Sequence, residues 1–186
     1  VCAGLDAYNS VHELVTAAIS VQVDDCANAG MLFMDVALAP AKIGDVYSRL
    51  VGQTYLNQLL KPFIDGIAAS GDTCEIDPTN VNKFSEVAVN TERLKFWTTK
   101  LLDTALLSLA ECPTQLQWLA AAIRDGAARR FSGSGTVSVA RFYFLRFLCT
   151  TLLTPVACGV LEREPLQRLA REGGLARWLG PLLFAV

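Results

Sequence analysis

The sequence predicts an all-α fold, an irregular bundle of helices. Apolar residues recur at the three-and-four spacing of amphipathic helices in most parts of the 186-residue chain. Alternation of apolar and polar residues never lasts long enough to favour a strand. Apolar residues also make up 52% of the chain, enough for a substantial buried core, so we expect residues 1–186 to form a single domain.

The first two predicted helices lie near the amino terminus. Residues 11–19 carry the amphipathic pattern of a helix, which the pair Asp24-Asp25 should end or follow. Residues 43–51 repeat the pattern. Gly52 follows at the point where a left-handed C-terminal cap would be needed, so we expect the second helix to end there.

The middle of the chain predicts further helices. Residues 55–67 have one apolar face, in which Pro62 marks a kink or the first turn of a new helix. After a loop, residues 94–109 form a long helix. Pro113 suits the first turn of the helix that follows, over residues 116–127.

The last part of the chain combines a polar loop with its most apolar helix. Residues 132–135 read Ser-Gly-Ser-Gly and predict an exposed loop. Residues 137–153 are apolar on nearly every face, which is typical of a central, fully buried helix. Counting the periodic segments gives a bundle of roughly seven or eight helices.

The charge is small but unevenly spread. The formal net charge is −2, which gives no reason to expect nucleic acid as a partner. Residues 1–41 contain no lysine or arginine, whereas residues 113–149 contain five arginines against the single acidic residue Asp125. A partner could recognise that asymmetry.

The residue types exclude several kinds of site. Six scattered cysteines without CxxC spacing, with His12 as the only histidine, suggest neither a zinc site nor a Cys/His nucleophile pair. We therefore expect no metal, no cofactor and reduced thiols in the cytoplasm. Arg146 interrupts the most apolar run, residues 142–161, so neither a membrane span nor a signal peptide is expected, and no direct membrane insertion.

Several ordered motifs resemble one protein family. Residues 144–155 read FLRFLCTTLLTP and resemble the FLRF signature of Ras GTPase-activating domains. Residues 50–56, LVGQTYL, are similar to the family's LVG-x-x-YL segment, and residues 74–78, CEIDP, to its CE-[IV]-DP loop. The similarity runs in order from about residue 32 to residue 165. It implies the all-helical fold of these domains and a role in regulating a Ras-like GTPase.

The same resemblance implies that the catalytic arginine is missing. The family inserts an arginine from a loop of the form LFR-x-NSLA-[ST]-K, and residues 32–42 match this loop. Met34 occupies the arginine position, or Asp35 if the register shifts by one, and Lys42 matches the loop lysine. The first arginine of the chain is Arg49, so no register restores the arginine finger. We expect impaired catalysis with no intact catalytic residue.

Other site residues are implied by the resemblance. Arg146 should brace the finger loop through the loop carbonyls; alternatively, it pairs with an interior carboxylate or caps backbone carbonyls. The Gly173-Gly174 pair should weaken or break a later helix, which in the family helps to hold the GTPase; alternatively, this stretch is a solvated helix end. The candidate GTPase-binding residues are Lys42, Phe144, Leu145, Arg168 and Arg171.

Three functions remain open at this stage. The first is a GTPase activator with impaired catalysis, which binds a Ras-family small GTPase in its GTP-bound form and has no catalytic centre of its own. The second is a non-catalytic Ras-binding scaffold, or pseudo-activator. The third is an unrelated helical interaction module. The first two imply a cytoplasmic protein, which domains outside this chain could recruit to the cytosolic face of a membrane.

Overall fold

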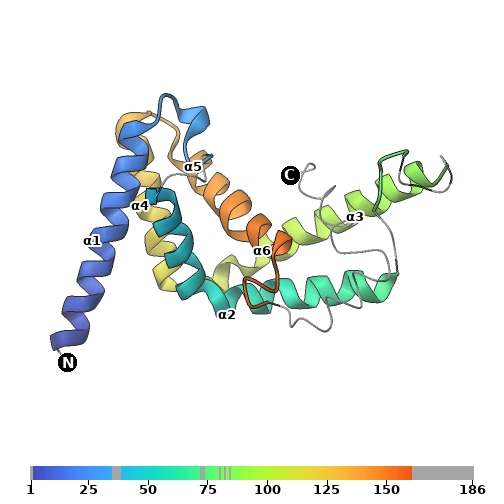
Figure 1. Cartoon of the computed structure of the whole chain (residues 1–186), viewed down its shortest axis with the longest axis horizontal. Coiled ribbons are helices and arrows are strands. Elements are labelled where there is room, and N and C mark those ends of the chain that lie inside the picture. Colours follow the sequence, from blue (N-terminus) through green and yellow to red (C-terminus); the bar gives the residue numbers. More distant parts are fainter. Residues whose placement is uncertain are drawn as a thin grey trace. The chain divides into compact units, whose positions relative to one another are not determined.

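The computed structural model describes residues 2–34, 39–71, 74–79, 81, 83 and 85–160 (Figure 1). Over these residues it is helical and contains no strand, so the all-α prediction is confirmed. The α-helices are α1 (Cys2–Asp25), α2 (Ala39–Ser70), α3 (Ser85–Leu107), α4 (Thr114–Arg130), α5 (Gly135–Arg141) and α6 (Thr150–Leu153). The shorter elements are the 3₁₀-helices η1 (Ala29–Met31) and η2 (Ser108–Glu111) and the π-helix η3 (Phe142–Cys149).

The chain divides into two compact units. The first comprises Val1–Gly52 and Pro113–Leu148, and the second comprises Gln53–Cys112 and Cys149–Val186. Each unit therefore joins two stretches that are distant in the sequence.

In the first unit, α1 and α4 lie side by side (Figure 1). Gly126 of α4 allows the close approach, since a Cβ atom there would lie 3.1 Å from Ile19 Cγ2. At the end of α1, Arg130 Nη1 donates to the carbonyl oxygen of Val23 at 2.9 Å and to that of Asp24. These carbonyls lie in the last turn of α1, where Val23 O also accepts from Cys26 N at 3.3 Å, and α1 ends at Asp25.

The predicted cap at Gly52 is wrong, because α2 continues through this residue to Ser70. Gly52 meets a different requirement. A Cβ atom there would lie 2.6 Å from Phe147 Cζ and 2.9 Å from Leu116 Cδ1, closer than side chains pack. The absent side chain thus serves helix packing inside the first unit. Pro62 also lies within α2, so no new helix begins there.

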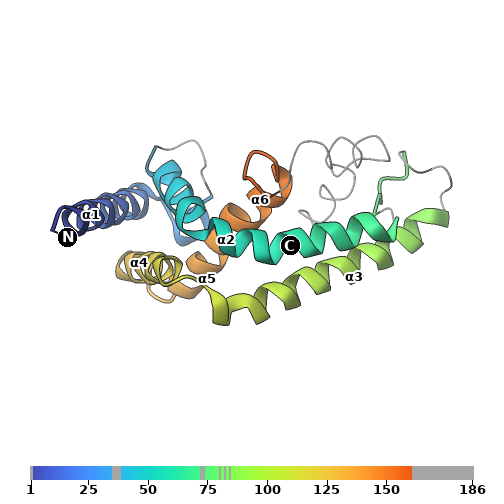
Figure 2. The same ribbon diagram turned by 90° about the horizontal axis from the view of Figure 1, so that it is seen from below.

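In the second unit, α3 runs alongside the second half of α2 (Figures 1 and 2). Phe63 of α2 and Trp97 of α3 are buried and meet edge to face, with ring centroids 5.8 Å apart. The loop before α3 contains the CEIDP motif, where Asn90 Nδ2 donates to the carbonyl oxygen of Glu75 at 2.8 Å. This buried asparagine therefore fastens the motif to α3.

The helical run from Gly135 to Leu153 differs from its prediction. It is continuous, but the π-helix η3 occupies its middle. Val137 and Leu153 are more than half exposed, so the expectation of full burial is wrong at both ends. By length and composition alone this run could cross a membrane, a property that it shares with core helices of soluble proteins, and 44% of it is buried.

Two boundaries near α4 shift slightly from their predictions. Pro113 precedes the first residue of α4 instead of lying within its first turn, and it adopts an extended ψ of 142°. The loop expected at residues 132–135 ends one residue earlier, because Gly135 begins α5. Gly135 is buried, and a Cβ atom there would lie 2.8 Å from the carbonyl oxygen of Arg124. Close backbone packing therefore explains this glycine.

Candidate functional site

The segment Cys26–Met34, which we call the arm, follows α1 and leads to residues 35–38, which precede α2. Its turn is closed by backbone hydrogen bonds, from Met31 N to Asn28 O and from Met34 N to Met31 O, each 3.1 Å long. Phe33 has a φ of 62°, in the left-handed region that residues with a β-carbon rarely adopt. Its side chain is buried, whereas Met34 is 47% exposed. The arm therefore turns Phe33 inward and leaves Met34 exposed.

Two consecutive residues hold the arm against the end of α5. Arg141 Nη1 donates to the carbonyl oxygen of Ala29 at 2.6 Å. The ring of Phe142 receives Phe33 edge to face, with centroids 6.2 Å apart and an interplanar angle of 80°. Phe33 and Phe142 are both buried. These contacts stabilise the left-handed residue that precedes Met34.

The helical run that contains Arg141 and Phe142 also contacts the beginning of α2, on the other side of residues 35–38 in the sequence. Residues 35–38 join Met34 to the first residue of α2, and a Cβ atom at Gly44 of α2 would lie 3.6 Å from Phe142 Cε2. Asp35, the alternative finger position, lies outside the described residues. Phe142 thus contacts both the arm and the beginning of α2.

Arg146 forms a buried ion pair with Asp45 of α2. Arg146 Nε donates to Asp45 Oδ1 at 3.0 Å and Nη2 donates to Oδ2 at 2.5 Å. The side chains are 6% and 16% exposed, respectively. Two parallel donors on one carboxylate fix the plane of the guanidinium group. The pairing with an interior carboxylate is therefore observed, whereas contact with carbonyls of residues 35–38 stays a prediction because those residues are not described.

The remaining candidates are placed as follows. Lys42 is exposed on the first turn of α2, and Phe144 and Leu145 are half-buried in η3. Arg168 and Arg171 lie outside the described residues, as does the Gly173-Gly174 pair. Met34, Lys42, Phe144, Leu145 and Arg146 all belong to the first unit.

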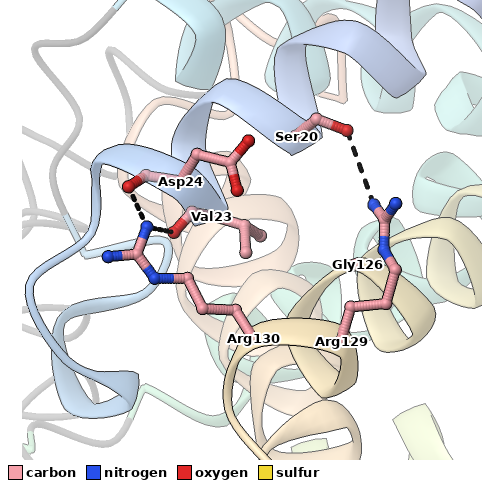
Figure 3. Close-up of a pocket in the computed structure, with 6 residues that line it drawn as sticks. All are labelled: Ser20, Val23, Asp24, Gly126, Arg129 and Arg130. Atoms are coloured by element: carbon pink, nitrogen blue, oxygen red, sulfur yellow. Dashed lines mark hydrogen bonds between the residues drawn. The ribbon is translucent and has the colours of Figure 1, made fainter.

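The arginine-rich stretch is used largely within the first unit. Arg129 and Arg130 of α4 line a cavity of about 290 Å³ with Ser20, Val23, Asp24 and Gly126 (Figure 3). Arg130 binds the end of α1, and Arg129 Nη2 lies 3.5 Å from Ser20 Oγ. With Arg141 and Arg146 included, the arginines of this stretch contact residues between 20 and 45, and most of these residues belong to the acidic segment, residues 1–41. Arg130 and Arg141 therefore bind backbone carbonyls, and Arg146 binds a carboxylate, that of Asp45, within the first unit.

Two kinds of reactive group can be followed among the described residues, metal ligands and cysteine thiols. Among them, no three His, Cys, Asp or Glu side chains are grouped so that they could hold a metal ion. Burial raises the pKa of the Cys112 and Cys149 thiols, which disfavours the thiolate that a nucleophile requires.

Comparison with known proteins relates this geometry to a family. Residues 83–172 match the family described as GTPase-activator protein for Ras-like GTPase. This range includes Phe144, Leu145 and Arg146 but begins after Met34 and Lys42.

Similar proteins extend the match towards the amino terminus. The chain is 31% identical over 161 residues to mouse Ras GTPase-activating protein 2, covering 85% of this chain and 19% of that protein. It is 32% identical over 153 residues to the human protein of that name, covering 81% and 18%. It is 30% identical over 147 residues to a probable Ras GTPase-activating-like protein, ngap, of Dictyostelium discoideum, covering 77% and 17%. The chain spans less than a fifth of the length of these relatives.

The structure adds residues that the sequence alone did not single out. Asp45, Arg141 and Phe142 complete the anchoring of the arm and α2. Phe142 stands two residues before the FLRF motif and was seen only as part of an apolar helix. The available signal was the position of Arg141 beside that motif, but nothing local identified Ala29 as its partner.

Proposed function

We propose that this chain is a GTPase-activating-type regulator of a Ras-like small GTPase, which binds the GTP-loaded form and has an impaired ability to promote hydrolysis. The observation that carries the proposal is the anchored arm. Phe33, Phe142 and Arg141 hold a segment that leaves residue 34 exposed, and Arg146, five residues after Arg141, forms a buried pair with Asp45 of α2. The similarity to Ras GTPase activators supports the same function.

The chemistry explains why catalysis should be impaired. Phosphoryl transfer develops negative charge on phosphate oxygens, and an activator stabilises it by inserting a guanidinium group, which always carries charge and offers several donors. The thioether of Met34 carries no charge and donates no hydrogen bond. If Asp35 stood at this position instead, its carboxylate would repel the phosphate. Hydrolysis would then rely on the GTPase's own groups, ordered by the bound chain.

A second candidate is a scaffold or competitor that binds the GTP-loaded GTPase without promoting hydrolysis. The observation that favours it is the combination of a well-packed anchor with an exposed, uncharged Met34. Both candidates share the same partner and the same surface. They differ only in whether binding accelerates hydrolysis.

Recognition of the GTPase is assigned to five residues of this chain. We propose Lys42, Phe144 and Leu145 as contacts, together with Arg168 and Arg171. Lys42 is exposed and would offer a cation to the partner or its nucleotide. The site of action is proposed to be the cytoplasm, with membrane recruitment depending on domains outside this chain.

Binding is the test of this function. A panel of Ras-family GTPases, each loaded with a fluorescent non-hydrolysable GTP analogue or with GDP, is titrated with the chain, and anisotropy is recorded. We expect at least one GTPase to bind the chain more tightly in the GTP-analogue form. Lys42→Glu should weaken this binding, whereas the matched control Lys61→Glu, which reverses another exposed lysine of α2, should not. Absence of nucleotide-dependent binding across the panel would reject the proposal.

A further inference from the structure

The left-handed Phe33 marks the arm as a segment that its surroundings must hold in place. A residue with a β-carbon persists at a φ of 62° only where packing and hydrogen bonds determine the conformation. The buried Phe33 ring supplies one constraint through Phe142. The ring fixes only the end of the arm that lies next to Met34.

Arg141 supplies the second constraint at the other end of the arm. Its Nη1 atom donates to the carbonyl oxygen of Ala29 at 2.6 Å, and Ala29 is the first residue of η1. A charged donor makes a shorter and stronger hydrogen bond to a carbonyl than a neutral donor does. Arg141 is partly buried, so solvent competes weakly for its guanidinium group. The arm is therefore fixed at Ala29 and at Phe33.

The π-helix η3 explains how one helical run contacts both the arm, which precedes residues 35–38, and α2, which follows them. Arg141 and Arg146 are five residues apart, and in an α-helix such residues point about 140° away from each other. The i→i+5 bonding of η3, which follows Arg141 directly, brings residues five apart onto adjacent turns. Arg141 can thus bind the arm before residues 35–38 while Arg146 binds Asp45 after them.

We propose that Arg141 is a positioning residue: it holds the arm so that residue 34 is presented to the nucleotide of a bound GTPase. The presentation to a nucleotide rests on the proposed function, whereas the holding of the arm does not. Arg141 acts indirectly, through its hydrogen bond to Ala29 and the backbone of the arm. A purely structural arginine would instead stabilise the first unit as a whole.

The first test measures the arm without any GTPase. Hydrogen exchange of the full chain is compared among the unmodified protein, Arg141→Ala, Arg141→Lys and the matched control Arg124→Ala, whose guanidinium group is exposed beside Asp125. In Arg141→Ala we expect the amides of Met31 and Met34 to exchange at least about tenfold faster, the consequence of losing one charge-assisted hydrogen bond. Arg141→Lys, which keeps a charged donor, should give a smaller change, and Arg124→Ala none. Unchanged exchange in the arm, or equal acceleration in α3 and α4, would overturn the proposal.

The second test measures whether Arg141 affects the presentation of residue 34 to the nucleotide. It uses the Met34→Arg variant as the background, because this variant supplies an arginine finger. Single-turnover hydrolysis is titrated with Met34→Arg alone and combined with Arg141→Ala, Arg141→Lys or Arg124→Ala. We expect Arg141→Ala to lower the maximal rate at least about tenfold while the half-saturating concentration changes less than threefold, and Arg141→Lys to restore most of the rate. A change confined to half-saturation would contradict a positioning role. If no variant binds or stimulates any GTPase, the proposed function fails, and hydrogen exchange still decides whether Arg141 holds the arm.

Discussion

Removal of Arg146 should reveal how strongly its ion pair with Asp45 stabilises the first unit. In Arg146→Met the Asp45 carboxylate loses two hydrogen bonds while its side chain stays only 16% exposed. Breaking a buried pair from one side costs about 3–5 kcal/mol, because it leaves a charge without compensation. The partial exposure of Asp45 places the expectation near the lower limit, about 3 kcal/mol.

The double variant Asp45→Leu/Arg146→Met separates the pair from other contacts of Arg146. When both charges are removed, no buried carboxylate remains, so about 2 kcal/mol of the loss should return. Urea unfolding followed by circular dichroism measures both values; with a slope of about 2 kcal/mol per molar, a loss of 3 kcal/mol lowers the midpoint by about 1.5 M.

An exposed pair provides the control for this cycle. Arg124 and Asp125 are 57% and 65% exposed, so Arg124→Met and its double variant with Asp125→Leu should leave the midpoint unchanged. The reasoning is refuted if Arg146→Met costs less than about 1 kcal/mol, or if the double variant is no more stable than Arg146→Met.

Three further predictions concern packing and titration. Gly52→Ala places a Cβ atom 2.6 Å from Phe147 Cζ. Overpacking costs about 1–3 kcal/mol and the helix preference of alanine returns about 1 kcal/mol, so urea unfolding should show a net loss of stability of up to about 2 kcal/mol. A gain in stability would contradict this expectation. The backbone N–H and the hydroxyl of Thr79 lower the pKa of Asp77. The ionised carboxylate therefore stabilises the fold above its unfolded pKa, and this contribution disappears as the pH falls through the folded pKa. Thr79→Val should raise the pKa of Asp77 in an NMR titration, and an unchanged pKa would count against a role for the hydroxyl. Burial raises the pKa of Cys149, so iodoacetamide should modify it more slowly in the folded than in the urea-unfolded chain, as mass spectrometry can measure; equal rates would show that the thiol is accessible.

The helices could be predicted from the sequence because their signal is local. The three-and-four spacing of apolar residues indicated most helices, and Asp24-Asp25 marked the end of α1 correctly. Gly52 was misread for an equally local reason, since glycine after an amphipathic segment usually ends a helix. Its actual role depends on Phe147 and Leu116, which lie far away in the sequence. Distant packing of this kind leaves no mark in the neighbouring residues.

The candidate site could be predicted only in part. Motif similarity suggested Arg146 and the position of Met34, but left the role of Arg146 open between bracing the finger loop, pairing with an interior carboxylate and capping backbone carbonyls. The pair with Asp45 is a contact that only the folded helices create, and bracing of the finger loop stays a prediction. The left-handed Phe33 carries no sequence signal, because glycine or asparagine normally marks such a conformation. Tertiary packing on Phe142 overrides that preference.

Our proposed function holds that residue 34 occupies the finger position of a GTPase activator and that the lack of a cation there impairs catalysis. Single-turnover GTP hydrolysis by a Ras-family panel, with the unmodified chain or Met34→Arg in excess, tests it most directly. An arginine supplied in trans accelerates hydrolysis by about 10³–10⁵-fold, so Met34→Arg should stimulate at least one GTPase by at least about 100-fold more than the unmodified chain does. Equal stimulation by both proteins would show that residue 34 is not the finger position, and strong stimulation by the unmodified chain would contradict impaired catalysis.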